Sequence, residues 1–159
     1  EMCIRDRFTP AGPDHAQIAA CAGIADYIDT LHQHHGGSSS ASATERGEFV
    51  HDLMRAHETK IMPPLLEWAS NKNSVRLLGP DKAGLRAPTI ALDIKQDPKD
   101  ITNKLAQKGI MAGSGDFYAV RALEAHDIDT SKGVLRLSYV HYTNREEIEK
   151  LVDALDCSI

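Results

Sequence analysis

The stretch from residue 133 to residue 155 constrains the fold of this chain more than any other part. It reads as an apolar strand with one charged residue, Arg136, followed by a polar turn at residues 142–144 and an amphipathic helix. A guanidinium in such a strand needs an anion or hydrogen-bond acceptors, because burying it unpaired is costly. The sequence therefore predicts that Arg136 is either half of a structural ion pair or a receptor for a carboxylate or phosphate.

The spacing of apolar residues, together with the positions of Pro, Gly and capping residues, predicts a chain of helices and short strands. A break is expected at Met62-Pro63-Pro64, because proline removes a helical hydrogen bond. Since strands adjoin in sequence, we predict an α+β fold, a small mixed or antiparallel sheet with helices packed on one face. The predicted helices are residues 14–34, 44–70, 97–108, 117–126 and 145–155; the predicted strands are 75–78, 89–94, 110–112 and 135–142, with a tight turn at 113–115.

Composition excludes several classes of partner. Hydrophobic residues make up 42% and charged residues 26% of the chain, as in ordinary soluble domains. The net charge of −5 and the lack of a basic run argue against a nucleic-acid partner, and no apolar segment is long enough to cross a membrane. The three cysteines form no CxxC, which favours a reducing compartment. Cys21 is interpreted as a small core residue.

The C-terminal stretch also carries a family pattern. It reads Leu135-Arg136-Leu137-Ser138, then His141-Tyr142-Thr143-Asn144, then Glu146-Glu147 and an apolar helix. This order resembles the C-terminal end of the class V, fold-type I, pyridoxal-phosphate enzymes, the aminotransferase and cysteine desulfurase group. In that family the strand arginine binds the α-carboxylate of the substrate, so the resemblance implies that Arg136 does so here. We interpret His141, at the exit of the strand, as either a packed or capping histidine or a residue that lines the same site.

A second match lies near the start of the chain. Residues 8–20, FTPAGPDHAQIAA, resemble a family segment that lies at the dimer interface and helps hold the cofactor phosphate of the neighbouring subunit. The family's Gly-Thr pair aligns with Ala11-Gly12, so the threonine hydroxyl is missing and only the Gly12 amide is left to bind phosphate. The resemblance thus implies a cytoplasmic homodimer with Gly12 in the cofactor site. The other interpretation is a Pro/Gly turn before a capped helix.

Residues 109–119 depart from the desulfurase pattern. Gly115 and Ala119 match it, but Tyr118 stands where those enzymes carry their nucleophilic cysteine, and the family's arginine falls near Ala112 or Gly113. Tyrosine cannot replace a thiolate that attacks the sulfur of the substrate. Desulfuration by this loop is therefore not expected, and the reaction type stays open between transamination, sulfur release and other chemistry at Cα or Cβ. Without the resemblance, the segment reads as a glycine turn with two aromatic residues packed in the core.

We expect the chain to be a fragment of such an enzyme. Residues 1–7 are interpreted as a foreign leader, 8–35 as the interdomain helix region, 36–43 as a flexible Gly/Ser connector and 44–159 as the C-terminal small domain. The resemblance implies a pyridoxal-phosphate enzyme in which the cofactor acts as an electron sink for a carbanion formed at Cα of an amino acid.

No catalytic residue is assigned within the chain. The Schiff-base lysine is expected in a large domain outside it, because no lysine here lies in a family motif. The histidines near residues 32–35 lack ligand spacing, so no metal site is predicted. The alternative from another class is a stand-alone α+β binding or regulatory module in which Arg136 senses a small carboxylate.

Overall fold

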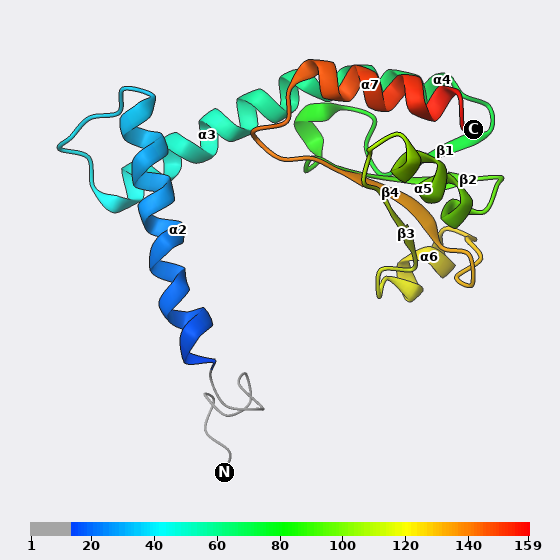
Figure 1. Ribbon diagram of the computed structural model, residues 1–159, viewed down its shortest axis with the longest axis horizontal. Helices are drawn as coiled ribbons and strands as arrows, with labels where there is room; N and C mark the ends of the chain where they lie inside the picture. The colour runs from blue at the N-terminus through cyan, green and yellow to red at the C-terminus, as the bar shows by residue number, and fades with distance from the viewer. Residues whose placement is uncertain (1–13) are drawn as a thin grey trace, which may run out of the picture. The chain divides into compact units, whose positions relative to one another are not determined.

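The computed structural model describes residues 14–159, which form helices and one four-stranded sheet (Figure 1). The predicted pattern of helices and strands is largely confirmed. In chain order the elements are α2 (His15–His34), α3 (Ala43–Ile61), α4 (Pro63–Asn71), β1 (Val75–Leu78), η1 (Ala83–Leu85), β2 (Thr89–Ile94), α5 (Pro98–Gln107), β3 (Gly113–Gly115), α6 (Val120–Ala125), β4 (Val134–Ser138) and α7 (Arg145–Asp156).

Prolines and capping residues explain where the helices begin. The expected break is confirmed, since α3 ends at Ile61 and α4 starts at Pro63, where the missing N–H of proline costs nothing. Asp97 caps α5 by accepting a hydrogen bond from the Lys99 amide at 2.8 Å. None of the described helices is long and apolar enough to cross a membrane.

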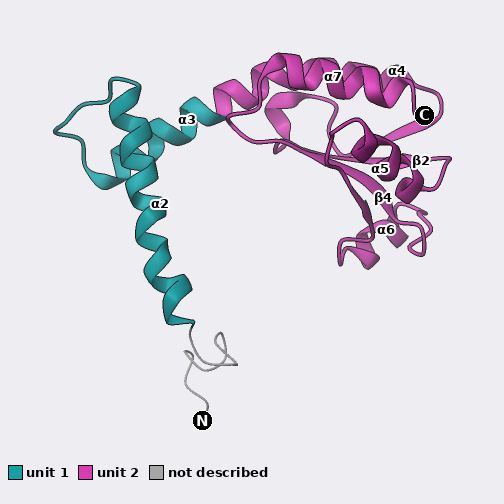
Figure 2. Cartoon of the chain, in the orientation of Figure 1, with its two compact units in different colours: residues 1–54 teal, residues 55–159 magenta. Residues whose placement is uncertain are grey.

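The chain divides into two compact units, Glu1–Met54 and Arg55–Ile159, with the boundary inside α3 (Figure 2). In the first unit, α2 and the start of α3 are joined by an ion pair of 2.6 Å between Arg46 Nε and Asp29 Oδ1. Cys21 is exposed on α2, so its predicted place in a core is wrong. The apolar period of α2 is real, but the described residues supply no core against its middle.

The second unit is built around an antiparallel sheet of order β1-β2-β4-β3. Helices α4, α5 and α7 pack on one face of it (Figure 1), which confirms the predicted α+β architecture. The short α6 packs with the other face through Leu123 and Val134. The fully buried part of the main core comes from both layers: Met62, Leu65, Ile90, Leu92, Ile101, Leu105, Leu135, Leu137, Ile148 and Leu155.

Four local predictions were wrong around the last two strands. Residues 110–112 form no strand, and the expected turn at 113–115 is instead strand β3, which pairs with Val134–Arg136 of β4. Glycines are weak strand formers, so the pairing with β4, not local propensity, makes this segment extended. Strand β4 ends at Ser138, not at residue 142, and α6 begins at Val120, not at residue 117.

The last helix opens with a reciprocal cap that positions the turn after β4. The Glu147 amide donates to Asn144 Oδ1 and the Asn144 amide donates to Glu147 Oε2, both at 2.8 Å. We expect Asn144→Ala to lower the free energy of unfolding by about 1 kcal/mol, measured by urea denaturation, because it removes this cap. Asn144→Asp is the matched control and should keep most of that stability. An equal loss in both variants would contradict the role of the cap.

Candidate carboxylate site on the open face of the sheet

Arg136 lies in the middle of β4, where alternate residues point to opposite faces of the sheet. Leu135 and Leu137 enter the main core, so Arg136 points to the face that the large helices leave open, and it is exposed. Its cross-strand partners are Ala91 in β2 and Gly113 in β3. Two small neighbours leave room around a long side chain.

The ring of Phe117 is the immediate partner of Arg136. The guanidinium carbon Cζ lies 3.9 Å from the centroid of the Phe117 ring, the geometry of a cation–π contact. A Cβ atom added at Gly113 would lie 3.0 Å from Phe117 Cζ and 3.9 Å from Arg136 Nε. Both side chains therefore lie over Gly113, and an alanine there would require the ring to move by a few tenths of an ångström.

The loop that carries Phe117 is strained. Phe117 and Tyr118 have φ angles of 51° and 59°, in the left-handed region, which costs about 1–2 kcal/mol for each residue other than glycine. Asp116 holds the turn, accepting from the Tyr118 amide at 3.1 Å with its side chain and from the Ala119 amide at 2.8 Å with its carbonyl. The prediction that both aromatics pack in the core is half wrong: Phe117 packs on the α6 cluster, but Tyr118 is fully exposed.

The structural ion pair predicted as one option for Arg136 is wrong for the described part of the chain. The ion pairs found among residues 14–159 involve other arginines, a lysine and a histidine; Arg76, for example, pairs with Asp93 across β1 and β2 at 3.0 Å. Arg136 contacts a ring instead of a carboxylate. An aromatic face attracts the charge but occupies none of the guanidinium N–H groups. These donors are therefore left for an anion from outside the described residues.

Arg86 lies in the same unit and, unlike Arg136, uses its guanidinium for hydrogen bonds within the fold. Its Nη atoms donate to the carbonyl oxygens of Leu78, Pro80 and Thr89 at 3.2, 2.6 and 3.1 Å. Burial lowers the pKa of Arg86, and burial likewise raises the pKa of the neighbouring Tyr139 phenol. The Arg86 guanidinium thus binds three backbone carbonyl oxygens, one at the end of β1, one in the segment after it and one at the start of β2, in contrast to that of Arg136.

The two other residues predicted for the site are His141 and Gly12. His141 lies three residues beyond the end of β4, half-buried, with its ring edge-to-face against Tyr142 at 5.2 Å. The same turn is anchored by a 2.7 Å hydrogen bond between His57 Nε2 and the Thr143 carbonyl. A role for His141 at the site stays a prediction. Gly12 lies outside the described residues.

The lysines of the chain do not fit a pyridoxal-phosphate site. An aldimine-forming lysine is typically desolvated or next to another cation. All lysines here lie among the described residues and none is buried. Three of these lysines make contacts with the C-terminal segment. Lys72 Nζ pairs with Asp156 at 2.6 Å, and Lys104 and Lys108 donate to the Ser158 and Ala154 carbonyls. The described residues also contain no group of three His, Cys, Asp or Glu that could hold a metal.

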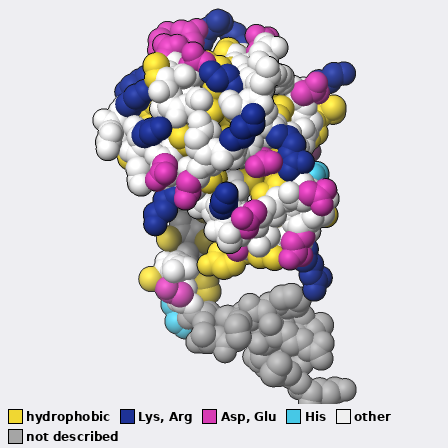
Figure 3. Space-filling model, turned by 90° about the vertical axis from the view of Figure 1, so that its right-hand side faces the viewer, with side chains coloured by type: hydrophobic (Ala, Val, Ile, Leu, Met, Phe, Trp, Pro, Cys, Tyr) yellow, Lys and Arg dark blue, Asp and Glu magenta, His cyan; other side chains and the backbone are white. Residues whose placement is uncertain are grey.

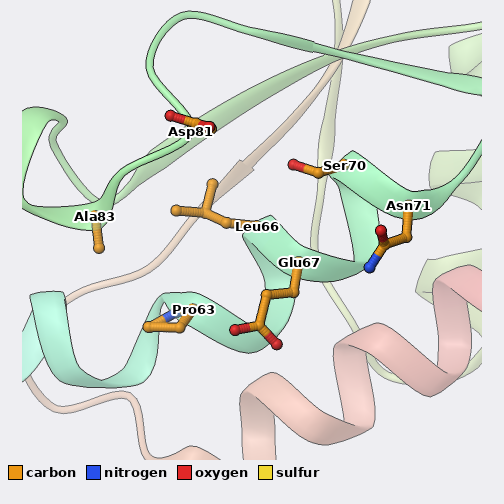
Figure 4. A pocket seen from close by; sticks show the side chains of 7 residues that line it. All are labelled: Pro63, Leu66, Glu67, Ser70, Asn71, Asp81 and Ala83. Carbon is orange, nitrogen blue, oxygen red and sulfur yellow. The ribbon is translucent and has the colours of Figure 1, made fainter.

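A surface pocket of about 300 Å³ lies between α4 and the segment after β1, away from the predicted site. In Figure 4, Leu66 and Ser70 point toward the segment that carries Asp81, whereas the Glu67 carboxylate turns away from it. The two carboxylates do not converge, so the pocket has no evident cation site. On the face shown in Figure 3, basic and acidic side chains are interspersed.

Comparisons with known proteins agree with this geometry. The family model "Aminotransferase class-V" matches residues 39–151. An aminotransferase-like protein of Gibberella zeae, FGM3, is 28% identical over 112 residues, which are 66% of this chain and 27% of that protein. A probable cysteine desulfurase of Aeropyrum pernix is 27% identical over 106 residues, which are 66% of this chain and 24% of that protein.

Solved structures show the same fold. The apo cysteine desulfurase of Thermococcus onnurineus superposes with a TM-score of 0.61 at 20% identity, covering 72% of this chain and 28% of that one. The cysteine desulfurase CsdA of Escherichia coli gives a TM-score of 0.55 at 19% identity, covering 77% and 32%. The chain spans about a quarter of the length of its curated relatives. The match of the family model over most of the sequence, on this fold, shows that the chain belongs to the class-V aminotransferase family.

Proposed function

We propose that this chain supplies the substrate-carboxylate receptor of a pyridoxal-phosphate-dependent class-V enzyme that acts on an amino acid, with Arg136 as the receptor. The observation that carries the proposal is an exposed guanidinium on the open face of the sheet, over the Phe117 ring, with no carboxylate partner among the described residues. A guanidinium offers two parallel N–H donors that match the two oxygens of a carboxylate.

The cofactor and its lysine belong, in this proposal, to parts of the enzyme outside the 159 residues. Class-V aminotransferases and cysteine desulfurases generally use pyridoxal phosphate, and the curated relatives are about four times as long as the matched segment. A cytoplasmic homodimer with Gly12 and His141 near the active site is part of the same proposal. The work of this chain is to bind and orient the carboxylate of the substrate, which holds the reacting carbon in place.

The sequence of the loop after β3 bears on which reaction the enzyme catalyses. Tyr118 stands where the resemblance places the desulfurase cysteine, and its side chain is fully exposed. The described cysteines, Cys21 and Cys157, lie outside this loop. Sulfur release through a thiolate at this loop is therefore not part of the proposal, and the reaction is taken as another transformation of an amino acid.

Titration of the ¹⁵N-labelled 159-residue chain tests the carboxylate role directly. We expect L-alanine to shift the Arg136 Nε–Hε resonance in a saturable way, and L-alaninamide, which lacks the carboxylate, to leave it unmoved. Arg76 is the internal control, because Asp93 already occupies its guanidinium. Equal shifts with both ligands, or an equal response at Arg76, would refute the assignment.

The same titration separates the proposal from the alternative, a stand-alone module that senses a small carboxylate. One exposed ion pair contributes at most about 1 kcal/mol, whereas a Kd of about 1 mM corresponds to about −4.1 kcal/mol, so the chain alone should bind L-alanine only at tens of millimolar or above. Saturation by a small carboxylate at micromolar concentration would favour the sensing module.

A further inference from the structure

We propose that Phe117 is a positioning residue for Arg136: its ring fixes the guanidinium over Gly113 so that the N–H groups are presented to a carboxylate. This inference rests on the proposed function and deepens it. The 3.9 Å distance from Arg136 Cζ to the ring centroid and the shared place over Gly113 carry it.

An exposed arginine needs such a partner to act as a receptor. Its long side chain has many rotamers, and binding a ligand must restrict them. A side chain that is already held in the binding conformation loses less entropy on binding, which raises affinity. The neighbours in the sheet, Ala91 and Gly113, are too small to restrain the guanidinium. Among the described residues, the Phe117 ring is the group in contact with it.

The nature of the contact suits a receptor. A carboxylate in place of Phe117 would also hold Arg136, but it would occupy the N–H groups that the substrate needs and would repel the incoming anion. The aromatic face attracts the cation through its quadrupole and leaves those N–H groups free. Phe117 can thus order the guanidinium without competing with the ligand.

The ring itself is held by its surroundings. It packs on the cluster of Leu123, Ile128 and Val134, and its backbone is fixed by the turn that Asp116 closes. A Cβ at Gly113 would be only 3.0 Å from the ring, a tight contact that the ring could relieve only by moving a few tenths of an ångström. The backbone at Phe117 adopts a left-handed φ of 51° to reach this place.

The test compares two substitutions at Phe117 in the ¹⁵N-labelled 159-residue chain. Phe117→Leu keeps an apolar side chain on the cluster but removes the ring, and Phe117→Tyr keeps the ring. In the parent chain we expect the Arg136 Nε–Hε resonance to be displaced by the ring current. The displacement should vanish in Phe117→Leu and persist in Phe117→Tyr. The Arg76 Nε–Hε resonance should be unchanged in both variants. Affinity for L-alanine should fall about two- to fivefold in Phe117→Leu and be retained in Phe117→Tyr.

Gly113→Ala provides an independent perturbation, because its methyl group requires the ring to move by a few tenths of an ångström without altering Phe117. We expect it to change the ring-current shift of the Arg136 Nε–Hε resonance and to weaken L-alanine binding, in both respects less than Phe117→Leu does. If Arg136→Ala abolishes L-alanine binding while Phe117→Leu and Gly113→Ala leave it unchanged, the positioning role is overturned and the proposed function stands. If Arg136→Ala leaves binding unchanged, the proposed function itself fails.

Discussion

Arg136→Ala in the complete enzyme should lower kcat/KM for the amino-acid substrate about 100-fold, mainly by raising KM. A hydrogen bond to a charged group contributes about 1.5–3 kcal/mol, and each 1.4 kcal/mol corresponds to a factor of ten. The variant loses two such bonds to one carboxylate, and part of that loss is offset by water in the open site. Steady-state kinetics measures the effect. The affinity for pyridoxal phosphate, followed by absorbance, should be unchanged, because Arg136 serves the substrate.

Two further variants make the result specific to the guanidinium. Arg136→Lys keeps the charge but loses the paired donors, so its kcat/KM should lie between those of the parent and the alanine variant. Arg76→Ala removes another exposed arginine of the same face, one already paired with Asp93, and should leave the kinetics unchanged. Substrate kinetics that do not respond to Arg136→Ala would rule out the carboxylate role.

Gly133→Ala should lower the free energy of unfolding by about 3 kcal/mol or more, combining backbone strain with overpacking. Gly133 has a φ of 68°, and a Cβ there would lie 2.1 Å from the Gly115 carbonyl carbon and 2.6 Å from its Cα. Backbone cannot move aside as a flexible side chain does, and β3 is tied to β4 by their pairing. The substitution should therefore displace β3, which is measurable by urea denaturation.

Gly79→Ala is the matched control for that prediction. Gly79 also has a positive φ, 80°, but no atom lies within 4 Å of an added Cβ. It should cost only about 1 kcal/mol, the price of the left-handed backbone alone. If Gly133→Ala were no more destabilising than Gly79→Ala, the close approach of Gly133 to β3 would be wrong. A displaced β3 should also disturb Arg136, whose partner Gly113 lies in that strand.

Local sequence signals were sufficient to predict the features that depend on interactions between residues close together in the chain. The Pro63 break, the Asp97 cap and the strands at residues 75–78 and 89–94 were all predicted with the observed bounds or nearly so. Proline lacks an N–H and a capping carboxylate binds the next amides, so both act within a few residues. The class-V pattern around Arg136 likewise depends on order along the chain, and the family model confirms it.

Features that depend on partners distant in sequence were missed. Gly113–Gly115 reads as a turn because glycine disfavours strands, and it becomes β3 only by pairing with β4. Phe117 reads as a helix or core residue, but its ring lies beside Arg136, 19 positions further along the chain. The two glycines in Gly-Ser-Gly are the one local hint that something packs closely there. Cys21 was misplaced because helical period alone does not show what covers a face.

The sequence by itself thus determined the order of helices and strands, the α+β class, the family and the identity of the arginine proposed to bind the carboxylate. Only the tertiary structure decided that this arginine lacks an ion-pair partner among the described residues and lies over Phe117. The physical reason is the separation along the chain over which each interaction acts. Caps, prolines and periodicity act between near neighbours, whereas strand register decides which side chains meet across a sheet, and register is set by the packing of the whole core.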